Sequence, residues 1–133
     1  MKIVIDYPPM MDEIHVVMGT RGQAILYAWG DTIYNPMGTK IPIQLYIHEQ
    51  VHEKQQAGKP ELWWKSYLAS PKFRLDMELP AHRAEYVAYC RLGNNRRARR
   101  IYLNGIARRL SGPLYGGLIS RKKAKELIHA ALA

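Results

Sequence analysis

The chain is 133 residues long and 47% hydrophobic, which predicts one globular domain with a single core and excludes two domains of ordinary size. Its single cysteine excludes an intramolecular disulfide, and its apolar runs fall short of the roughly 18 residues that span a membrane. The formal net charge of +9 excludes a predominantly acidic chain, and we expect a cytoplasmic protein because the first residues do not have a signal-peptide pattern.

The first part of the chain favours β structure. Runs rich in β-branched and aromatic residues predict strands over residues 2–6, 14–18, 24–29 and 32–34. Gly30 and Asp31 stand where a short turn would join the last two of these strands. We therefore expect a small antiparallel β-sheet within residues 1–38.

From residue 42 onward the patterns are helical. We expect helices over about 42–57, 62–68, 77–92, 95–110 and 120–132. Pro42 suits a first helical turn, and Gly58 suits a helix end. Asn94 or Asn95 can cap the fourth helix, and Ser120 the last one. The predicted fold class is α+β, with a β-rich segment, a helical body and a basic helical part over 94–133.

Residues 48–52 read His-Glu-Gln-Val-His and form the most informative motif of the chain. On a helix, residues four apart lie on one face, so His48 and His52 can bind the same metal ion. Glu49 beside them can take a proton from the attacking water. The motif predicts metal-assisted hydrolysis, most often of a peptide bond, with one Zn²⁺ per chain. The alternative is a chance match of two solvated histidines.

Two histidines leave a ligand missing, and we expect it within 78–86, Glu-Leu-Pro-Ala-His-Arg-Ala-Glu-Tyr. A helix with H-E-x-x-H followed by a second helix that opens E-x-x-A resembles the gluzincin zinc peptidases, above all the minigluzincins, and is similar to the cores of CAAX-prenyl-type and ImmA/IrrE-like peptidases. The resemblance implies Glu78 as the third ligand. The string H-E-x-x-H-x-x-Q at 48–55 with Glu-Leu-Pro-Ala also resembles metallopeptidase-like proteins of bacteriophages, which would place the chain in a host cytoplasm or a virion.

The sequence departs from the larger families at His82. CAAX-type enzymes carry an aspartate at that place, which supports a metal-binding histidine. His82 could instead act as an electrophile toward the substrate carbonyl or as a metal ligand. Glu85, seven residues after Glu78, shares its helical face and is a rival ligand or a partner of a ligand.

Turnover also needs a hydrogen-bond donor that stabilises the oxyanion. Tyr115 is the first candidate because glycines flank its loop, although a tyrosine there could equally anchor a turn. His82 and Tyr86 are the alternatives. The resemblance further implies that an extended peptide pairs with the strand that precedes the metal helix, within 24–34.

The last third of the chain is strongly basic. Residues 91–133 hold 11 Lys and Arg against 1 acidic residue, whereas residues 1–90 hold 9 against 10. The densest cluster comprises Arg96, Arg97, Arg99 and Arg100. It predicts contact with nucleic acid or an acidic protein, and the alternative is a solvated helix face.

These patterns together predict a zinc-dependent metallopeptidase that cleaves a peptide or protein substrate and has no membrane association. One alternative is a basic module that binds nucleic acid or acidic proteins and keeps a metal only for structure. Another is a phage virion or accessory protein. Glu49 separates the first two, because a structural site does not need a free carboxylate beside an open coordination position.

Overall fold

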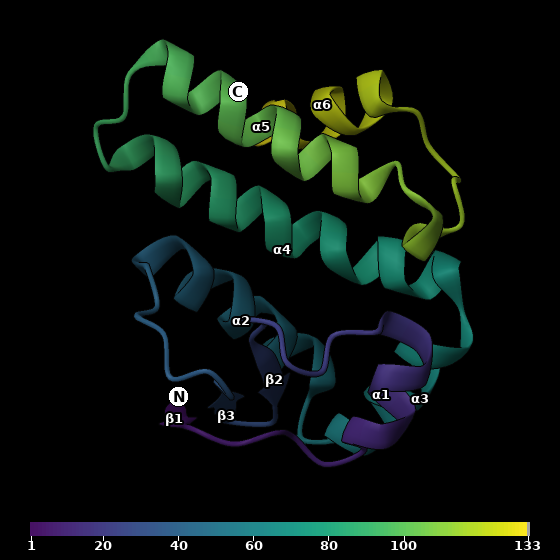
Figure 1. The fold of residues 1–133 in the computed structure, drawn as a ribbon. Helices are drawn as coiled ribbons and strands as arrows, with labels where there is room; N and C mark the ends of the chain where they lie inside the picture. Colours follow the sequence, from purple (N-terminus) through teal and green to yellow (C-terminus); the bar gives the residue numbers. More distant parts are fainter. Residues whose placement is uncertain (133) are drawn as a thin grey trace.

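The computed structural model describes residues 1–132, which form a small sheet and a stack of helices (Figure 1). The strands are β1 (Lys2–Val4), β2 (Tyr27–Trp29) and β3 (Thr32–Tyr34). The helices are α1 (Met11–Met18), α2 (Ile43–Gln56), α3 (Pro60–Ala69), α4 (Pro71–Arg91), α5 (Arg96–Leu110) and α6 (Arg121–His129), with short 3₁₀ turns η1 (Pro113–Tyr115) and η2 (Ala130–Leu132). The fold is therefore α+β, as the sequence predicts.

The sheet is mixed, so the expectation of an antiparallel sheet was wrong in part. Its strand order is β1-β3-β2. β2 and β3 form the expected hairpin around Gly30 and Asp31 and pair antiparallel. β1 pairs parallel to β3, with Lys2 opposite Thr32. A parallel pair needs a long crossover between its strands, and here that connection contains α1 and β2.

The strand predicted over 14–18 is instead the end of α1. Met11 and Ile14, three residues apart, are buried on one side of this helix, whereas Val16 is 84% exposed. Asp12 and Glu13 lie in the first turn, where the helix dipole favours acidic residues. These helical signals outweigh the β preference of the branched residues.

α4 is the central helix, lying between α2 on one side and α5 on the other (Figure 1). It begins at Pro71, six residues before the predicted start, because Ser70 caps it by accepting a hydrogen bond from the Phe73 amide. Pro80 therefore lies inside the helix rather than near its beginning. Its ring is exposed, so water can solvate the carbonyl that lacks an amide partner.

Two apolar clusters form the core. One lies between α4, α5, η1 and α6 and includes Leu75, Tyr86, Ile106, Leu110 and Ile128. The other joins α1, β2 and α3 through Met11, Ile14, Tyr27 and the aromatic residues Trp63, Trp64 and Tyr67. Between the two clusters, α2 packs on α4 through polar side chains. No helix within residues 1–132 has the length and apolar character needed to cross a membrane.

Candidate metal centre

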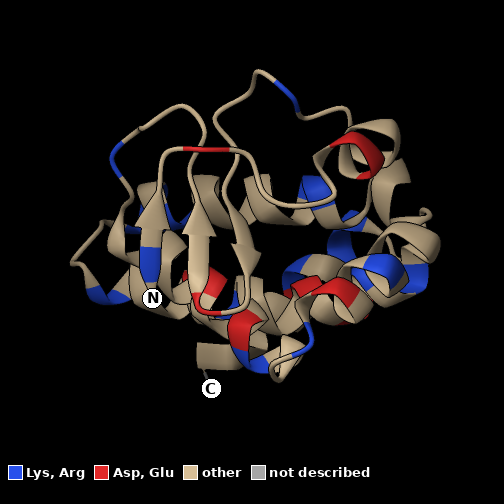
Figure 2. Cartoon of the chain, turned by 90° about the horizontal axis from the view of Figure 1, so that it is seen from below, with Lys and Arg blue, Asp and Glu red and all other residues tan. Residues whose placement is uncertain are grey.

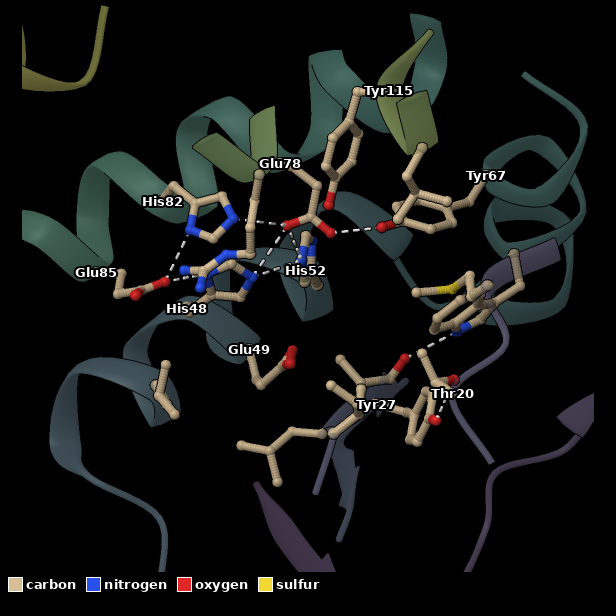
Figure 3. Close-up of a pocket in the computed structure, with 18 of the residues that line it drawn as sticks. Thr20, Tyr27, His48, Glu49, His52, Tyr67, Glu78, His82, Glu85 and Tyr115 are labelled. Carbon is tan, nitrogen blue, oxygen red and sulfur yellow. Dashed lines mark hydrogen bonds and ion pairs between the residues drawn. The ribbon is translucent and has the colours of Figure 1, made fainter. Parts of the chain in front are cut away.

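Six buried polar side chains gather on the facing surfaces of α2 and α4 (Figure 3). They are His48, Glu49 and His52 from α2 and Glu78, His82 and Glu85 from α4. Spacings of three and four residues place each set along one side of its helix. Ala81, fully buried between them, has a methyl group that lets the two helices approach closely.

Three of these side chains converge on one point. The Nε2 atoms of His48 and His52 are 3.1 Å apart. Glu78 Oε1 lies 3.0 Å from the first nitrogen and 3.1 Å from the second. The atoms therefore form a nearly equilateral triangle, and Figure 3 shows all three side chains pointing into the same small space.

The remaining hydrogen bonds indicate which atoms carry protons. His48 Nδ1 lies 2.8 Å from Glu85 Oε1, so this nitrogen donates to the carboxylate. His52 Nδ1 lies 2.8 Å from Gln55 Oε1, and the amide of Gln55 is oriented because its nitrogen donates to the Met77 carbonyl. Both imidazoles in the neutral state thus turn an unprotonated Nε2 toward Glu78, and three acceptors face one another.

A cation fits this arrangement. Zinc bonds of about 2.0–2.1 Å to nitrogen and oxygen in a tetrahedron place neighbouring ligand atoms about 3.3 Å apart. The three edges of the triangle, 3.0 to 3.1 Å, are close to that separation. Two imidazole nitrogens and one carboxylate oxygen are also the ligand types of a catalytic zinc site.

Further side chains hold the ligands in place. Tyr67 donates to Glu78 Oε2 at 2.6 Å, so only the other oxygen of Glu78 remains for a metal. Glu85 accepts from His48 and from His82 Nδ1, the latter at 2.9 Å, and Tyr102 donates to its second oxygen at 2.5 Å. Glu85 thus accepts from three donors in an arrangement by which carboxylates commonly orient histidine ligands, and with His48 and His82 it also forms a second group that could hold a metal.

Charge and burial act in opposite directions on these groups. Burial alone would lower the pKa of His48, but hydrogen bonds to Glu78 and Glu85 raise this pKa well above its ordinary value. Burial would raise the pKa of Glu78, but His52 and His48 lower it well below the usual range. The imidazoles of His48 and His52 therefore tend to take up protons, so a metal ion would compete with protons for the same atoms.

Glu49 is the buried carboxylate of the cluster without a complete set of partners. It is 6% exposed, and its Oε2 has no hydrogen-bond partner within residues 1–132. Burial raises the pKa of the Glu49 carboxyl, an effect that the charges of His48 and His52 oppose. In Figure 3 its side chain points away from Glu85 and toward the side of the site on which Tyr27 lies. An unpaired buried acceptor costs about 1–3 kcal/mol, so this position favours a functional role over a structural one.

The cluster borders a cavity of about 340 Å³. Its floor is polar, and its walls include Met18, Ile25, Trp63 and Leu114. Tyr115, on η1, also lines this cavity, and its hydroxyl points toward the carboxylate of Glu78 (Figure 3). Burial, and then the charge of Glu78, raise the pKa of Tyr115, so its phenol stays protonated and can donate a hydrogen bond.

His82 lies beside the triangle but outside it. Its Nε2 is 3.9 Å from Glu78 Oε1, farther than the mutual distances of the three convergent atoms. Its ring contacts that of His48 edge to face, with centroids 4.6 Å apart. Burial lowers the pKa of His82, so the ring is held neutral with its Nδ1 proton on Glu85.

Roles in the site were not predicted for Tyr67, Tyr102 and Gln55. Gln55 entered only through the phage-type string. The signal for Gln55 was its spacing, since it follows His52 by three residues on the same helix face. Tyr67 and Tyr102 reach the site through tertiary packing, which no local pattern reveals.

The predicted arginine cluster lies on α5, away from the triangle. Arg96, Arg97 and Arg100 are exposed, whereas Arg99 is half-buried and donates to the Asn94 carbonyl. The view from the sheet side shows basic and acidic residues interspersed over the elements that face the viewer (Figure 2). The excess of positive charge belongs to the carboxyl-terminal part of the chain, where residues 91–133 hold 11 lysines and arginines against 1 acidic residue.

Comparisons of this chain with protein-family models, with curated proteins and with solved structures found no match.

Proposed function

We propose that the protein is a zinc-dependent metallopeptidase in which His48, His52 and Glu78 hold the metal. The observation that carries the proposal is the triangle of three acceptor atoms, which face one another at 3.0 to 3.1 Å. Each ligand has its other polar atom occupied by a neighbour: Glu85 for His48, Gln55 for His52 and Tyr67 for Glu78. Such oriented ligands are typical of metal centres.

The chain supplies the groups that peptide hydrolysis requires. A bound zinc ion would polarise the substrate carbonyl and lower the pKa of water. Glu49 accepts the proton of the attacking water and returns it to the departing amine, a role favoured by its raised pKa and its free oxygen. Tyr115 donates its phenolic hydrogen to the carbonyl oxygen as negative charge develops there. His82 lacks a proton on Nε2 when neutral, so it is the weaker candidate for this donor.

The substrate is proposed to lie between β2 and α2. β2 is an edge strand, and residues 24–28 line the cavity. The Ala28 carbonyl already accepts hydrogen bonds from Gln56 and Trp64, at 2.8 and 2.9 Å. An extended peptide can therefore pair with the segment 24–26, which precedes this blocked carbonyl.

Metal analysis tests the proposal. The purified protein should hold close to one zinc per chain, and His48→Ala/His52→Ala should hold almost none. The matched control is His15→Ala/His129→Ala, which removes two exposed histidines of other helices and should keep the zinc. Cleavage of a randomised decapeptide library, followed by mass spectrometry, tests the reaction. Stoichiometric zinc in the first double variant, or no cleavage by zinc-loaded protein, would contradict the proposal.

A polyanion-binding surface is a second candidate function. It is favoured because Arg96, Arg97 and Arg100 are exposed on one helix and form no ion pair within residues 1–132. Binding to heparin should weaken steeply as salt rises, since counterions are released on binding. Replacing the four clustered arginines by serine should flatten this dependence without changing zinc content, and retention that ignores salt would contradict the surface.

A further inference from the structure

The last turn of α5 places one arginine at the cavity. Arg108 and Arg109 are adjacent, but a helix turns them about 100° apart. Arg109 follows Tyr102 by two helical turns and shares its face, and Tyr102 donates to Glu85 in the metal centre. Both side chains are exposed to solvent, but Arg109 lines the cavity and Arg108 does not.

Arg109 has no protein carboxylate to pair with. Its guanidinium forms no ion pair or hydrogen bond within residues 1–132, although its backbone carbonyl accepts from the Gly112 amide. The three carboxylates that line the cavity have other roles, because Glu78 and Glu85 accept from neighbours and Glu49 is the proposed base. Among the described residues that line the cavity, Arg109 is also the single lysine or arginine.

The surroundings of Arg109 strengthen an interaction with an anion. The guanidinium lies near the phenols of Tyr115 and Tyr102. Burial raises the pKa of each phenol, and the positive charge of Arg109 opposes that rise. Leu114 and Tyr115 line the same cavity as Arg109. A guanidinium in such a place binds a carboxylate through two parallel hydrogen bonds.

We propose that Arg109 binds a carboxylate of the peptide substrate and so makes this protein selective for acidic peptides. The carboxylate is either the side chain of an acidic residue near the scissile bond or the free carboxyl terminus. This inference rests on the proposed peptidase function, since it assigns the substrate class of the same cavity. It is distinct from the polyanion surface, which involves the clustered arginines in the first turns of α5.

Peptide binding to the zinc-loaded Glu49→Gln variant, in which turnover is blocked, tests the inference. The probes are alanine-leucine hexapeptides blocked at both ends that carry one glutamate at each position in turn, with glutamine partners. A second pair has a neutral sequence and ends in a free carboxylate or an amide. Because Trp63 and Trp64 line the cavity, tryptophan fluorescence reports occupancy.

We expect about tenfold tighter binding of one acidic probe than of its neutral partner, as a charge-assisted pair at a partly solvated site provides. Arg109→Gln should remove this preference. Arg108→Gln is the matched control, because it removes the same charge from the neighbouring position and should keep the preference. The probe pair whose two members bind with different affinities identifies whether the carboxylate is a glutamate side chain or the free carboxyl terminus.

Three outcomes would overturn the inference: equal binding of acidic and neutral probes, a preference that survives Arg109→Gln, or an equal loss for all probes in that variant. The last would mean that Arg109 contacts the peptide backbone. Repeating the titration with metal-free protein separates this result from the proposed function. A charge preference in a protein that neither binds zinc nor cleaves peptides would contradict the proposed peptidase function alone. Peptide cleavage without a charge preference would contradict the Arg109 inference alone.

Discussion

The two buried faces of α4 contrast sharply. Toward α5 and α6 the helix presents Leu75 and Tyr86, which join an apolar cluster. Toward α2 it presents Glu78, His82 and Glu85, which are equally buried. Apolar burial stabilises the fold by about 25 cal/mol per Å², whereas buried polar groups cost free energy unless each finds a partner.

The contrast indicates that the apolar and polar faces of α4 have different roles. The apolar face needs only complementary packing, and a change there should affect stability. The polar face is almost completely hydrogen-bonded, with Glu85 at 1% exposure accepting from three donors. Such a network adds little to net stability compared with an apolar seam, so its retention favours a role in binding and chemistry.

The largest effect should come from Glu49→Gln on the polar face. The amide keeps the shape of the carboxylate but cannot accept a proton, so peptide hydrolysis should fall by about 10²- to 10⁴-fold. Zinc content and unfolding midpoint should change little. Glu53→Gln, which alters a carboxylate one turn further along α2, is the control and should keep full activity. Loss of zinc from Glu49→Gln would mean that this residue is a ligand rather than the base.

A substitution in the apolar cluster should lower the stability of the protein. Leu110→Ala removes a fully buried side chain of the α5 cluster, so the free energy of unfolding should fall by about 2–5 kcal/mol. Urea denaturation measures this change, and the folded variant should still bind one zinc. Leu118→Ala, at a half-exposed leucine, should shift the same quantity by less than about 0.5 kcal/mol. Loss of zinc stoichiometry in folded Leu110→Ala would remove the distinction between the faces.

A smaller effect is expected from Glu85→Gln, which weakens the support of His48. Partners of ligands contribute about 10- to 100-fold to metal affinity, so zinc should bind more weakly by that factor. Competition with a fluorescent chelator measures the affinity. Tyr89→Phe serves as the control, because the Tyr89 ring stacks on Tyr102 at 3.9 Å and keeps that contact. An unchanged affinity in Glu85→Gln would assign this residue to packing alone.

The pH dependence should distinguish the metal-free and zinc-loaded proteins. The pKa values of His48 and His52 are raised, because Glu78 outweighs the burial that would lower them. Their protonation stabilises the metal-free fold fully below pH 6.5, and this contribution is lost as pH rises through the folded pKa values. Burial lowers the pKa of His82, so its titration lies below this window.

Zinc displaces those protons, so its affinity and its stabilising effect should increase over the same window. We expect the thermal midpoint to fall above pH 6.5 in metal-free protein and to rise in the presence of a fixed zinc excess. Calorimetry of both forms measures this difference. Parallel curves would show that zinc and protons do not share the site.

Local patterns predicted helix α2 well. The structure gives α2 as Ile43–Gln56 against an expected 42–57, since the proline and glycine at its borders act locally. The hairpin at Gly30 and Asp31 and the caps at Asn95 and Ser120 were predicted for the same reason. Local turn and capping residues therefore predicted the order of most strands and helices along the chain.

Features that depend on tertiary contacts escaped prediction. The segment 14–18 has β-branched residues, but burial of Met11 and Ile14 on one side makes it helical. The parallel pairing of β1 and β3 cannot be inferred from either strand alone. Glu78, which the family resemblance implied as a ligand, does belong to the triangle formed with His48 and His52. The contact of Glu85 with His48 was not predicted, because it depends on how α2 and α4 are rotated against each other.

The hydrogen bonds to Ala28 also bear on self-association. Open edge strands are templates for pairing between copies of a protein, and β2 is such an edge. Gln56 and Trp64 occupy its carbonyl, so a second copy cannot extend the sheet past this point. These two side chains therefore limit strand pairing at the β2 edge of the sheet, and a peptide bound as proposed would pair only with the residues that precede Ala28.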